Sequence, residues 1–381
     1  MLSSRMLVPI ATLALLPALL SGCEAPEPVE APLSDEALAA VSEDAGAPRD
    51  DVARQVDDLF VKEGLGETRA LVLIANGEIA AERYGEGYDA NTRLVSWSMA
   101  KTVSAVLIGM LVADGRLDIE GPAPVALWQR PGDPRGAISL RHLLQMRSGL
   151  RHTEAGDPPY ESSEVRMLFL DGRDDMAQWA KEQPLEAEPG ERFEYSSNTS
   201  VILADIAARA LTKSEDPEMR RRAVADYLQS RLFEPLGMTS MVPEFDASGT
   251  LIGGSLMHAT ARDWAKLGEM LRNKGRAPTG EQLVPATWVE WMTTSSPASP
   301  HYGYQTWLNR EFREPGATDL PVLFPDRAPE TMFAMIGHMG QYVLVSPSQR
   351  VTLVRLGHSD REQRVAMMQE LADILELYPE R

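Results

Sequence analysis

Strand-like patterns occur near both ends of the chain. In Arg69–Gly85, two apolar runs are joined at Asn76-Gly77, a pair of residues typical of a two-residue hairpin turn. Thr331–Gly357 contains three apolar runs, which Gly337–Gly340 and Pro347-Ser348 separate. We therefore expect strands from the two ends of the chain to pair in one antiparallel sheet.

Helical spacing of apolar residues fills most of the sequence between these runs. From Ser98 onward, apolar residues recur at helical intervals until Asp114-Gly115 ends the pattern. Further helices are predicted over Asp51–Lys62, Ser139–Leu150, Ser196–Leu211, Arg221–Met238, Ala261–Gly275, Ala286–Thr294 and Arg361–Tyr378.

This order of elements predicts an α/β protein of the α+β type. Residues 50–137 and 243–381 would form a domain with an antiparallel sheet flanked by helices. Residues 138–242 would form a mainly helical subdomain inserted between them.

The N-terminus has the pattern of an export signal. One early arginine, Arg5, precedes an apolar stretch over Met6–Leu20, and Leu20-Ser21-Gly22-Cys23 resembles a bacterial lipobox. We expect residues 1–22 to be a lipoprotein signal peptide and Cys23 to carry the lipid; the alternative is a chance cysteine behind a different cleavage site. Residues 23–49 are rich in Ala, Pro and Glu and are predicted to be a disordered tether.

Charge and cysteine content narrow the partners. The formal net charge of −19 disfavours nucleic acid, whose binding depends on basic side chains. Cys23 is the only cysteine, so the chain can form no internal disulfide. We expect an exported protein on the periplasmic or outer face of a bacterial membrane, held there by its lipid; the sequence gives no oligomeric state.

The first candidate for chemistry is Ser98-Met99-Ala100-Lys101. Residues three apart on a helix share a face, so Lys101 can take the Ser98 proton if burial lowers its pKa. The spacing also arises by chance in ordinary helices. However, Lys101 is one of six lysines and lies in an apolar helix, where an unpaired ammonium is costly.

Two further segments can complete a site. Tyr195 follows Pro189-Gly190 and precedes a helix, where its phenol can relay protons or simply pack its ring. His338, between Gly337 and Gly340, can donate to a substrate carbonyl or carboxylate, or can be a structural histidine at a strand end.

Taken together, Ser98–Lys101, Tyr195-Ser196-Ser197 and His338-Met339-Gly340 resemble the three motifs of the serine beta-lactamase-like hydrolases. The branch in question comprises class C beta-lactamases, D,D-peptidases, family VIII esterases and 6-aminohexanoate-dimer hydrolases. The resemblance runs from about residue 55 to the C-terminus and includes Val95–Ile119, Ile138–Leu150, Pro189–Ile206, Phe233–Ser240 and Gly253–Leu271.

The resemblance implies a role for each motif. Ser98 would be the acylated nucleophile, and Lys101 and Tyr195 the base and proton relay. The backbone N–H groups of Ser98 and Gln341 would form the oxyanion hole. Residues implied to line the substrate site are His338, Gly340, Ser197 and Asn198. No metal or organic cofactor is needed.

Two departures from the penicillin-recognising members guide the choice of substrate. His338 stands where they have a lysine that meets the substrate carboxylate, and Ser197 stands where they have an asparagine, with Asn198 one residue later. We therefore expect a hydrolase of small esters or amides. The alternatives are a D,D-peptidase or beta-lactamase, and a sensor that kept the fold without turnover. Trp307 is expected either at the cleft mouth or in the core.

Overall fold

The computed structural model describes residues 32–310 and 323–381. Within them, Leu33–Arg381 forms one compact unit. The predicted signal peptide, Cys23 and the first part of the predicted tether lie outside the described residues.

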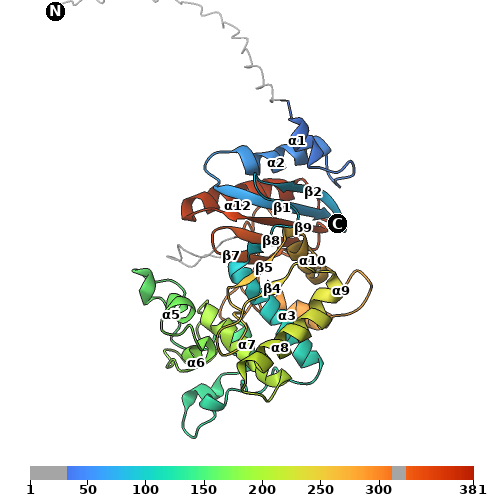
Figure 1. Ribbon diagram of the computed structural model, residues 1–381. Coiled ribbons are helices and arrows are strands. Elements are labelled where there is room, and N and C mark those ends of the chain that lie inside the picture. Colours follow the sequence, from blue (N-terminus) through green and yellow to red (C-terminus); the bar gives the residue numbers. More distant parts are fainter. Residues whose placement is uncertain (1–31, 311–322) are drawn as a thin grey trace, which may run out of the picture. The chain divides into compact units, whose positions relative to one another are not determined.

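The central sheet is built from both ends of the chain, as predicted. All of its strands are antiparallel, and Figure 1 shows the blue N-terminal strands beside the red C-terminal ones. Its strands, in spatial order, are β2 (Glu78–Tyr84), β1 (Glu67–Ala75), β9 (Val351–His358), β8 (Gln341–Ser346), β7 (Phe333–Gly337) and β6 (Trp307–Leu308). The predicted fold class is confirmed.

The β1–β2 hairpin turns where the sequence predicts. Ala75 pairs with Glu78, which leaves Asn76 and Gly77 as the two turn residues. Their φ angles are 54° and 94°. Two consecutive positive φ angles define a type I′ turn, whose twist matches that of the strands.

Helices cover both faces of this sheet, because its buried strands carry apolar side chains on both faces. Leu71 and Leu73 face one layer and Val72 and Ile74 the other. The first layer contains α2 (Arg49–Val61) and α12 (Arg361–Glu376), and the second α3 (Ala100–Ala113) and α10 (Ala261–Arg272). Gly268 of α10 lies so close to the sheet that a Cβ there would be 2.7 Å from Thr352 Cγ2.

The segment between residues 138 and 242 is helical, with differences in the boundaries. The helix predicted over Ser139–Leu150 stops at Leu144, before Met146 takes a positive φ of 55°. The helices of this part are α4 (Leu140–Leu144), α5 (Ser163–Phe169), α6 (Met176–Lys181), α7 (Ser197–Leu211), α8 (Pro217–Leu228) and α9 (Glu234–Leu236), with a π-helical turn over Gln229–Phe233.

A small second sheet lies beside the start of α3. Its strands are β3 (Leu94–Val95), β5 (Met257–Ala259) and β4 (Val242–Pro243). The Ser96 N–H donates to the Met257 carbonyl at 2.8 Å. The sheet thus fixes the chain immediately before Ser98. Helix α11 (Ala286–Met292) is a short helix that follows α10 in the sequence.

The second part of the predicted tether is folded, which corrects the expectation of disorder up to residue 49. Helix α1 (Asp35–Ala39) has Ser34 as its N-cap, and Ala37, Val41 and Ala45 are buried. Val41 and Ala45 belong to the same hydrophobic cluster as the buried residues of α2 and α12, and Val41 pairs with Ala81 of β2. The composition of the segment does not reveal these contacts. No helix among the described residues has both the length and the apolar character needed to cross a membrane.

Candidate active site

Ser98 lies at the junction of a short 3₁₀ turn and the most deeply buried helix. The turn covers Trp97–Met99 and continues directly into α3, whose residues from Ala100 to Leu111 are all buried. Trp97 has a φ of 46°, a left-handed conformation that is rare for a bulky residue. The Ser98 side chain lines a cavity, so the turn presents its hydroxyl at the end of a rigid helix.

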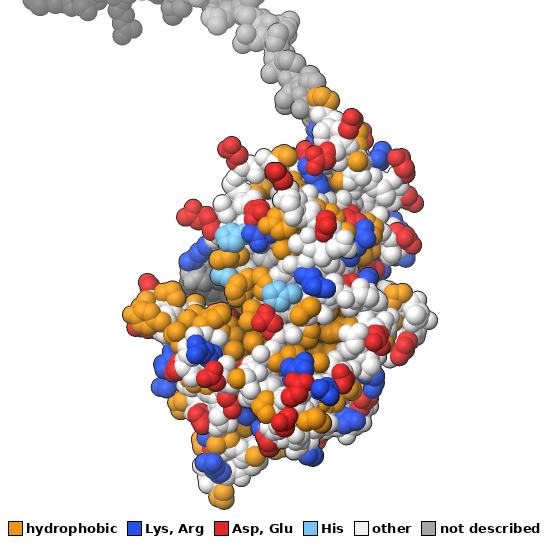
Figure 2. All heavy atoms as spheres, in the orientation of Figure 1, with side chains coloured by type: hydrophobic (Ala, Val, Ile, Leu, Met, Phe, Trp, Pro, Cys, Tyr) orange, Lys and Arg blue, Asp and Glu red, His pale blue; other side chains and the backbone are white. Residues whose placement is uncertain are grey.

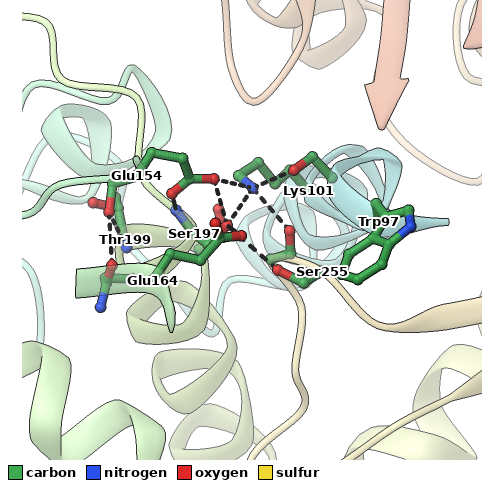
Figure 3. A network of polar contacts seen from close by, with 12 residues as sticks. Trp97, Lys101, Glu154, Glu164, Ser197, Thr199 and Ser255 are labelled. Atoms are coloured by element: carbon green, nitrogen blue, oxygen red, sulfur yellow. Dashed lines mark hydrogen bonds and ion pairs between the residues drawn. The ribbon is translucent and has the colours of Figure 1, made fainter. Parts of the chain in front are cut away.

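Lys101 is inside the protein and is fully hydrogen-bonded. Its side chain is 1% exposed. Its Nζ donates to Ser98 Oγ at 2.9 Å, to Ser197 Oγ at 2.7 Å and to the Gly254 carbonyl at 2.8 Å (Figure 3). The predicted Ser98–Lys101 pair is therefore within hydrogen-bonding distance, at the spacing that the helix imposes.

Two glutamates that the sequence analysis did not identify complete this network (Figure 3). Glu154 Oε1 accepts from Ser197 Oγ at 2.7 Å and lies 3.5 Å from Lys101 Nζ, and its Oε2 accepts from the Ser197 N–H at 2.6 Å. Glu164 Oε1 accepts from Ser197 Oγ at 3.0 Å. Ser197, the first residue of α7, thus links the buried ammonium to two carboxylates.

Two opposing effects act on the pKa of Lys101. Burial lowers it, and the negative charges that Tyr195, Glu154 and Glu164 can carry raise it above its ordinary value, contrary to the lowered pKa expected from the sequence. The three acceptors around Nζ match the three N–H donors of the ammonium form. Burial, with the Glu154 charge, also raises the pKa of Glu164 to about 8.

Tyr195 lies over the same lysine. Lys101 Nζ is 4.7 Å from the centroid of the Tyr195 ring, and the ring packs on Trp307 at 5.1 Å between centroids. Burial raises the pKa of the Tyr195 phenol, while Lys101 and Ser98 act against that rise. The structure brings Ser98, Lys101 and Tyr195 together, with the phenol in its protonated form at neutral pH.

The third motif is placed differently from what the resemblance implies. Gly337 and His338 line the cavity, and the His338 ring packs edge-on against Trp97 at 5.4 Å. Burial and the neighbouring Arg364 lower the pKa of His338, so its ring is neutral at pH 7.

The chain then turns away from the cavity. Met339 and Gly340 have φ angles of 56° and 82° and form the turn between β7 and β8. Gln341 pairs with Gly337, is 3% exposed, and donates from its side chain to the His338, Met339 and Gly357 carbonyls. Neither Gly340 nor Gln341 is among the described residues that line the cavity.

Ser197 and Asn198 also separate. Successive residues on a helix point about 100° apart, so the two side chains cannot both face Lys101. Asn198 Nδ2 donates to the Ser163 carbonyl and to Met167 Sδ, both at 3.3 Å, in the interface with α5. Asn198 is therefore a packing residue, whereas Ser197 is part of the network around Lys101.

The cavity above Ser98 has a volume of about 880 Å³ and a largely apolar wall. Trp307 is buried and also lines it, so both positions expected for this residue apply. Among the described lining residues, Arg364 of α12 has the one arginine or lysine side chain, and its Nε has no hydrogen-bond partner. The apolar lining residues include Pro159, Val165, Leu168, Phe169, Phe193 and Ile336.

Figure 2 shows hydrophobic side chains gathered on this face near α5, where Phe169 and Leu170 are about half exposed. Within residues 32–310 and 323–381, no group of three or more His, Cys, Asp or Glu side chains is arranged to hold a metal ion.

Known proteins are similar to this chain in sequence and in fold. The sequence profile of the Beta-lactamase family matches residues 60–376. The 6-aminohexanoate-dimer hydrolase of Paenarthrobacter ureafaciens is 26% identical over 238 residues, which cover 58% of this chain and 56% of that protein. The match thus spans little more than half the length of this curated relative.

Solved structures agree in fold. A candidate 6-aminohexanoate-dimer hydrolase from Bacillus anthracis has a TM-score of 0.64 at 21% identity, over 82% of this chain and 81% of its own. A family VIII carboxylesterase has a TM-score of 0.60 at 15% identity, over 86% of this chain and 97% of its own. The chain belongs to the beta-lactamase family, and its fold is that of the beta-lactamase-related serine hydrolases. The resemblance inferred from the three motifs is confirmed.

Proposed function

We propose that the protein hydrolyses small esters or amides through an acyl-enzyme formed on Ser98. The observation that carries this proposal is the distance of 2.9 Å between Lys101 Nζ and Ser98 Oγ, with Tyr195 beside the lysine. Ser98 and Tyr195 line a cavity of about 880 Å³. A serine that lines a cavity and lies next to a buried amine has the arrangement of an activated nucleophile.

Each group has a step in this mechanism. Ser98 Oγ attacks the substrate carbonyl and gives its proton to Lys101 when that side chain is a neutral amine, and the tetrahedral oxyanion forms in front of backbone N–H donors. We assign these donors to Ser98 and His338, because the end of β7 lies at the cavity and Gln341 does not. The protonated Tyr195 phenol donates to the leaving group, and water then releases the acyl group.

The lining favours a substrate with an apolar chain and a polar end. Aromatic and aliphatic side chains form most of the wall, and Arg364 brings to it a guanidinium that can meet a carboxylate; among the described residues, its Nε has no hydrogen-bond partner. Similarity to a 6-aminohexanoate-dimer hydrolase supports a linear amide. Arg364 also keeps a D,D-peptidase or beta-lactamase activity as the second candidate, because those substrates carry a carboxylate.

Replacement of the nucleophile tests the proposal. In Ser98→Ala, turnover of p-nitrophenyl esters should fall by about 10³-fold or more, and labelling by a fluorophosphonate probe should disappear. Ser104→Ala is the matched control, because Ser104 is a buried serine of α3, the helix that follows Ser98, and donates to the Gly253 carbonyl; it should keep the label. Equal labelling of Ser98→Ala would overturn the assignment. Acylation of the parent without release would identify a sensor.

We also propose that the folded unit is exported and attached to a bacterial membrane through a lipid on Cys23. The support is the sequence alone: the apolar stretch, the lipobox-like Leu20–Cys23 and the single cysteine. The small-molecule ester or amide and the membrane are thus the proposed partners.

A further inference from the structure

Lys101 is held in a state that cannot act as a base. An ammonium has three N–H donors and no acceptor. Its donors go to Ser98 Oγ, Ser197 Oγ and the Gly254 carbonyl, at 2.7–2.9 Å. Ser98 Oγ is thus an acceptor from Lys101, and the lysine must lose one proton before it can receive the proton of Ser98.

The three acceptors differ in what they can do with that proton. The Gly254 carbonyl cannot pass a proton on, and Ser98 is the nucleophile itself. The Ser197 hydroxyl accepts from Lys101 at 2.7 Å and at the same time donates to Glu154 Oε1 at 2.7 Å. A hydroxyl that accepts on one side and donates to a carboxylate on the other is a one-residue proton wire.

The transfer also suits the buried surroundings. Because burial and the charge of Glu154 raise the pKa of Glu164 to about 8, the carboxylate that can receive a proton through Ser197 is that of Glu154. Moving a proton from Lys101 to that carboxylate turns an ammonium and a carboxylate into two neutral groups. Burial of Lys101 lowers the cost of this transfer, because burial disfavours an ammonium relative to a neutral amine and this side chain is 1% exposed.

We propose that Glu154, supported by Glu164, accepts the Lys101 proton through the Ser197 hydroxyl and so converts Lys101 into the base that activates Ser98. In this step the Nζ–H bond of Lys101 breaks and a new Oγ–H bond forms on Ser197. The original Oγ–H bond of Ser197 breaks, and an O–H bond forms on Glu154 Oε1. Glu154, Glu164 and Ser197 are positioning residues of the reaction described above, and this inference rests on that proposed function.

Several other charged or titratable groups lie around Glu154, and their charges influence the pH at which the proposed proton transfer occurs. They come from α3, α5, the segment before α7, the strand-like segment before β6 and the end of β7: Lys101, Glu164, Glu194, Tyr195, Tyr302 and His338. Of the carboxylates in this set, Glu194 lines the cavity, so it cannot serve as a neutral control. Glu191, an exposed glutamate three residues earlier that is not among the residues lining the cavity, is the matched control for Glu154.

The decisive measurement is the rate of acylation between pH 5.5 and 10, from the p-nitrophenol burst, in Glu154→Gln and Glu191→Gln. With the relay, Glu154→Gln acylates about 100-fold more slowly at pH 7 and recovers at high pH, because solvent hydroxide then deprotonates Lys101. Glu191→Gln keeps the acid limb of the parent.

If Glu154 only stabilises the ammonium, its removal lowers the pKa of Lys101. Acylation in Glu154→Gln would then be faster at pH 7, with the acid limb at lower pH, and this result would overturn the proposal. A loss that is equal at all pH values would overturn it as well, because it would indicate a purely structural role.

Ser197→Ala tests the wire independently, with Ser255→Ala as its control. Ser255 Oγ donates to Ser197 Oγ at 3.3 Å but lies outside the proposed path. We expect Ser197→Ala to match the pH profile of Glu154→Gln and Ser255→Ala to match the parent, with thermal unfolding confirming that each variant is folded. If the parent labels at Ser98 while both Ser197→Ala and Glu154→Gln acylate normally, the relay alone is wrong. If the parent does not label, both proposals fail.

Discussion

Gly337, the last residue of β7, lies directly against the segment that carries the nucleophile. A Cβ at this position would be 2.2 Å from the Ser96 carbonyl oxygen, well inside any real contact. Because Ser96 precedes the turn that holds Ser98, a side chain here would move one wall of the site against the other. Gly337 thus sets the distance between the nucleophile and the proposed oxyanion donors.

We expect Gly337→Ala to lower kcat/KM for a p-nitrophenyl ester by about 100-fold, the effect of a displacement of about 1 Å in a catalytic site. The free energy of unfolding should fall by about 1–3 kcal/mol. Gly121→Ala is the control, since its Cβ would approach only the Asp118 side chain, at 3.1 Å. Unchanged kcat/KM in Gly337→Ala would show that this close approach does not position the site.

The residues that could be predicted from the sequence are those whose partner lies a fixed number of positions away. Ser98 and Lys101 share a helix face, so their contact follows from the spacing. Glu154 and Glu164 could not be chosen in this way, because they are two of 56 acidic residues and meet Ser197 only through tertiary packing. A buried lysine requires a counter-charge, but the sequence does not say which carboxylate supplies it.

At the level of elements, three helices of the helical part meet at one buried carboxylate. Asp205 of α7 accepts from Lys181 of α6 at 2.8 Å and from Arg220 of α8 at 2.7 Å. All three side chains are less than 10% exposed. The charges hold the Asp205 pKa below its ordinary value, against the effect of burial. Helix α7 also carries Ser197 at its start, so this cluster fixes the helix that positions the network around Lys101.

Asp205→Asn should lower the free energy of unfolding by about 3–5 kcal/mol at pH 7, because it leaves two buried cations without their counter-charge. A depressed folded-state pKa means that the stabilisation is fully present above the unfolded-state pKa of Asp. It is lost as the pH falls through the lowered folded-state value. Urea unfolding at pH 7, 5 and 3.5 should therefore show a constant difference from the parent at pH 7 and 5 and a smaller one at pH 3.5. Asp226→Asn, an exposed change in α8, should leave the free energy of unfolding within about 0.5 kcal/mol.

Elements with a strong local signal were predicted well, and those decided by packing were not. The Asn76-Gly77 turn and the three C-terminal strands follow from turn chemistry and apolar runs. The helix from Ser139 is shorter than its periodicity suggests, since Met146 leaves the helical conformation. Positive φ angles also explain why Gln341 is not at the cavity. Met339 and Gly340 form a turn that leads the chain away from it.

At the scale of the whole molecule, the segment before α2 covers the edge strand of the sheet. β2 is the outer strand of the sheet, and residues 40–42 pair with it: the Ser42 N–H donates to the Ala80 carbonyl at 2.9 Å, and the Glu82 N–H donates to the Ala40 carbonyl at 2.8 Å. Covering an outer strand in this way prevents it from pairing with other chains. The folded unit therefore starts earlier than composition predicts, and the tether of the proposed anchor is correspondingly shorter.

Val41→Asp in the full chain tests this role. Val41 is 3% exposed, so an unpaired carboxylate there should detach the segment and lower the free energy of unfolding by about 2–4 kcal/mol. Limited proteolysis should then cleave between residues 33 and 48 faster than in the parent, and the uncovered β2 should promote association at high protein concentration. Val365→Asp, at a position 68% exposed on α12, is the control and should change neither property. If Val41→Asp unfolds like the parent, the segment is a tether after all, and the free side of β2 must be protected by its charged residues, such as Glu78 and Glu82, alone.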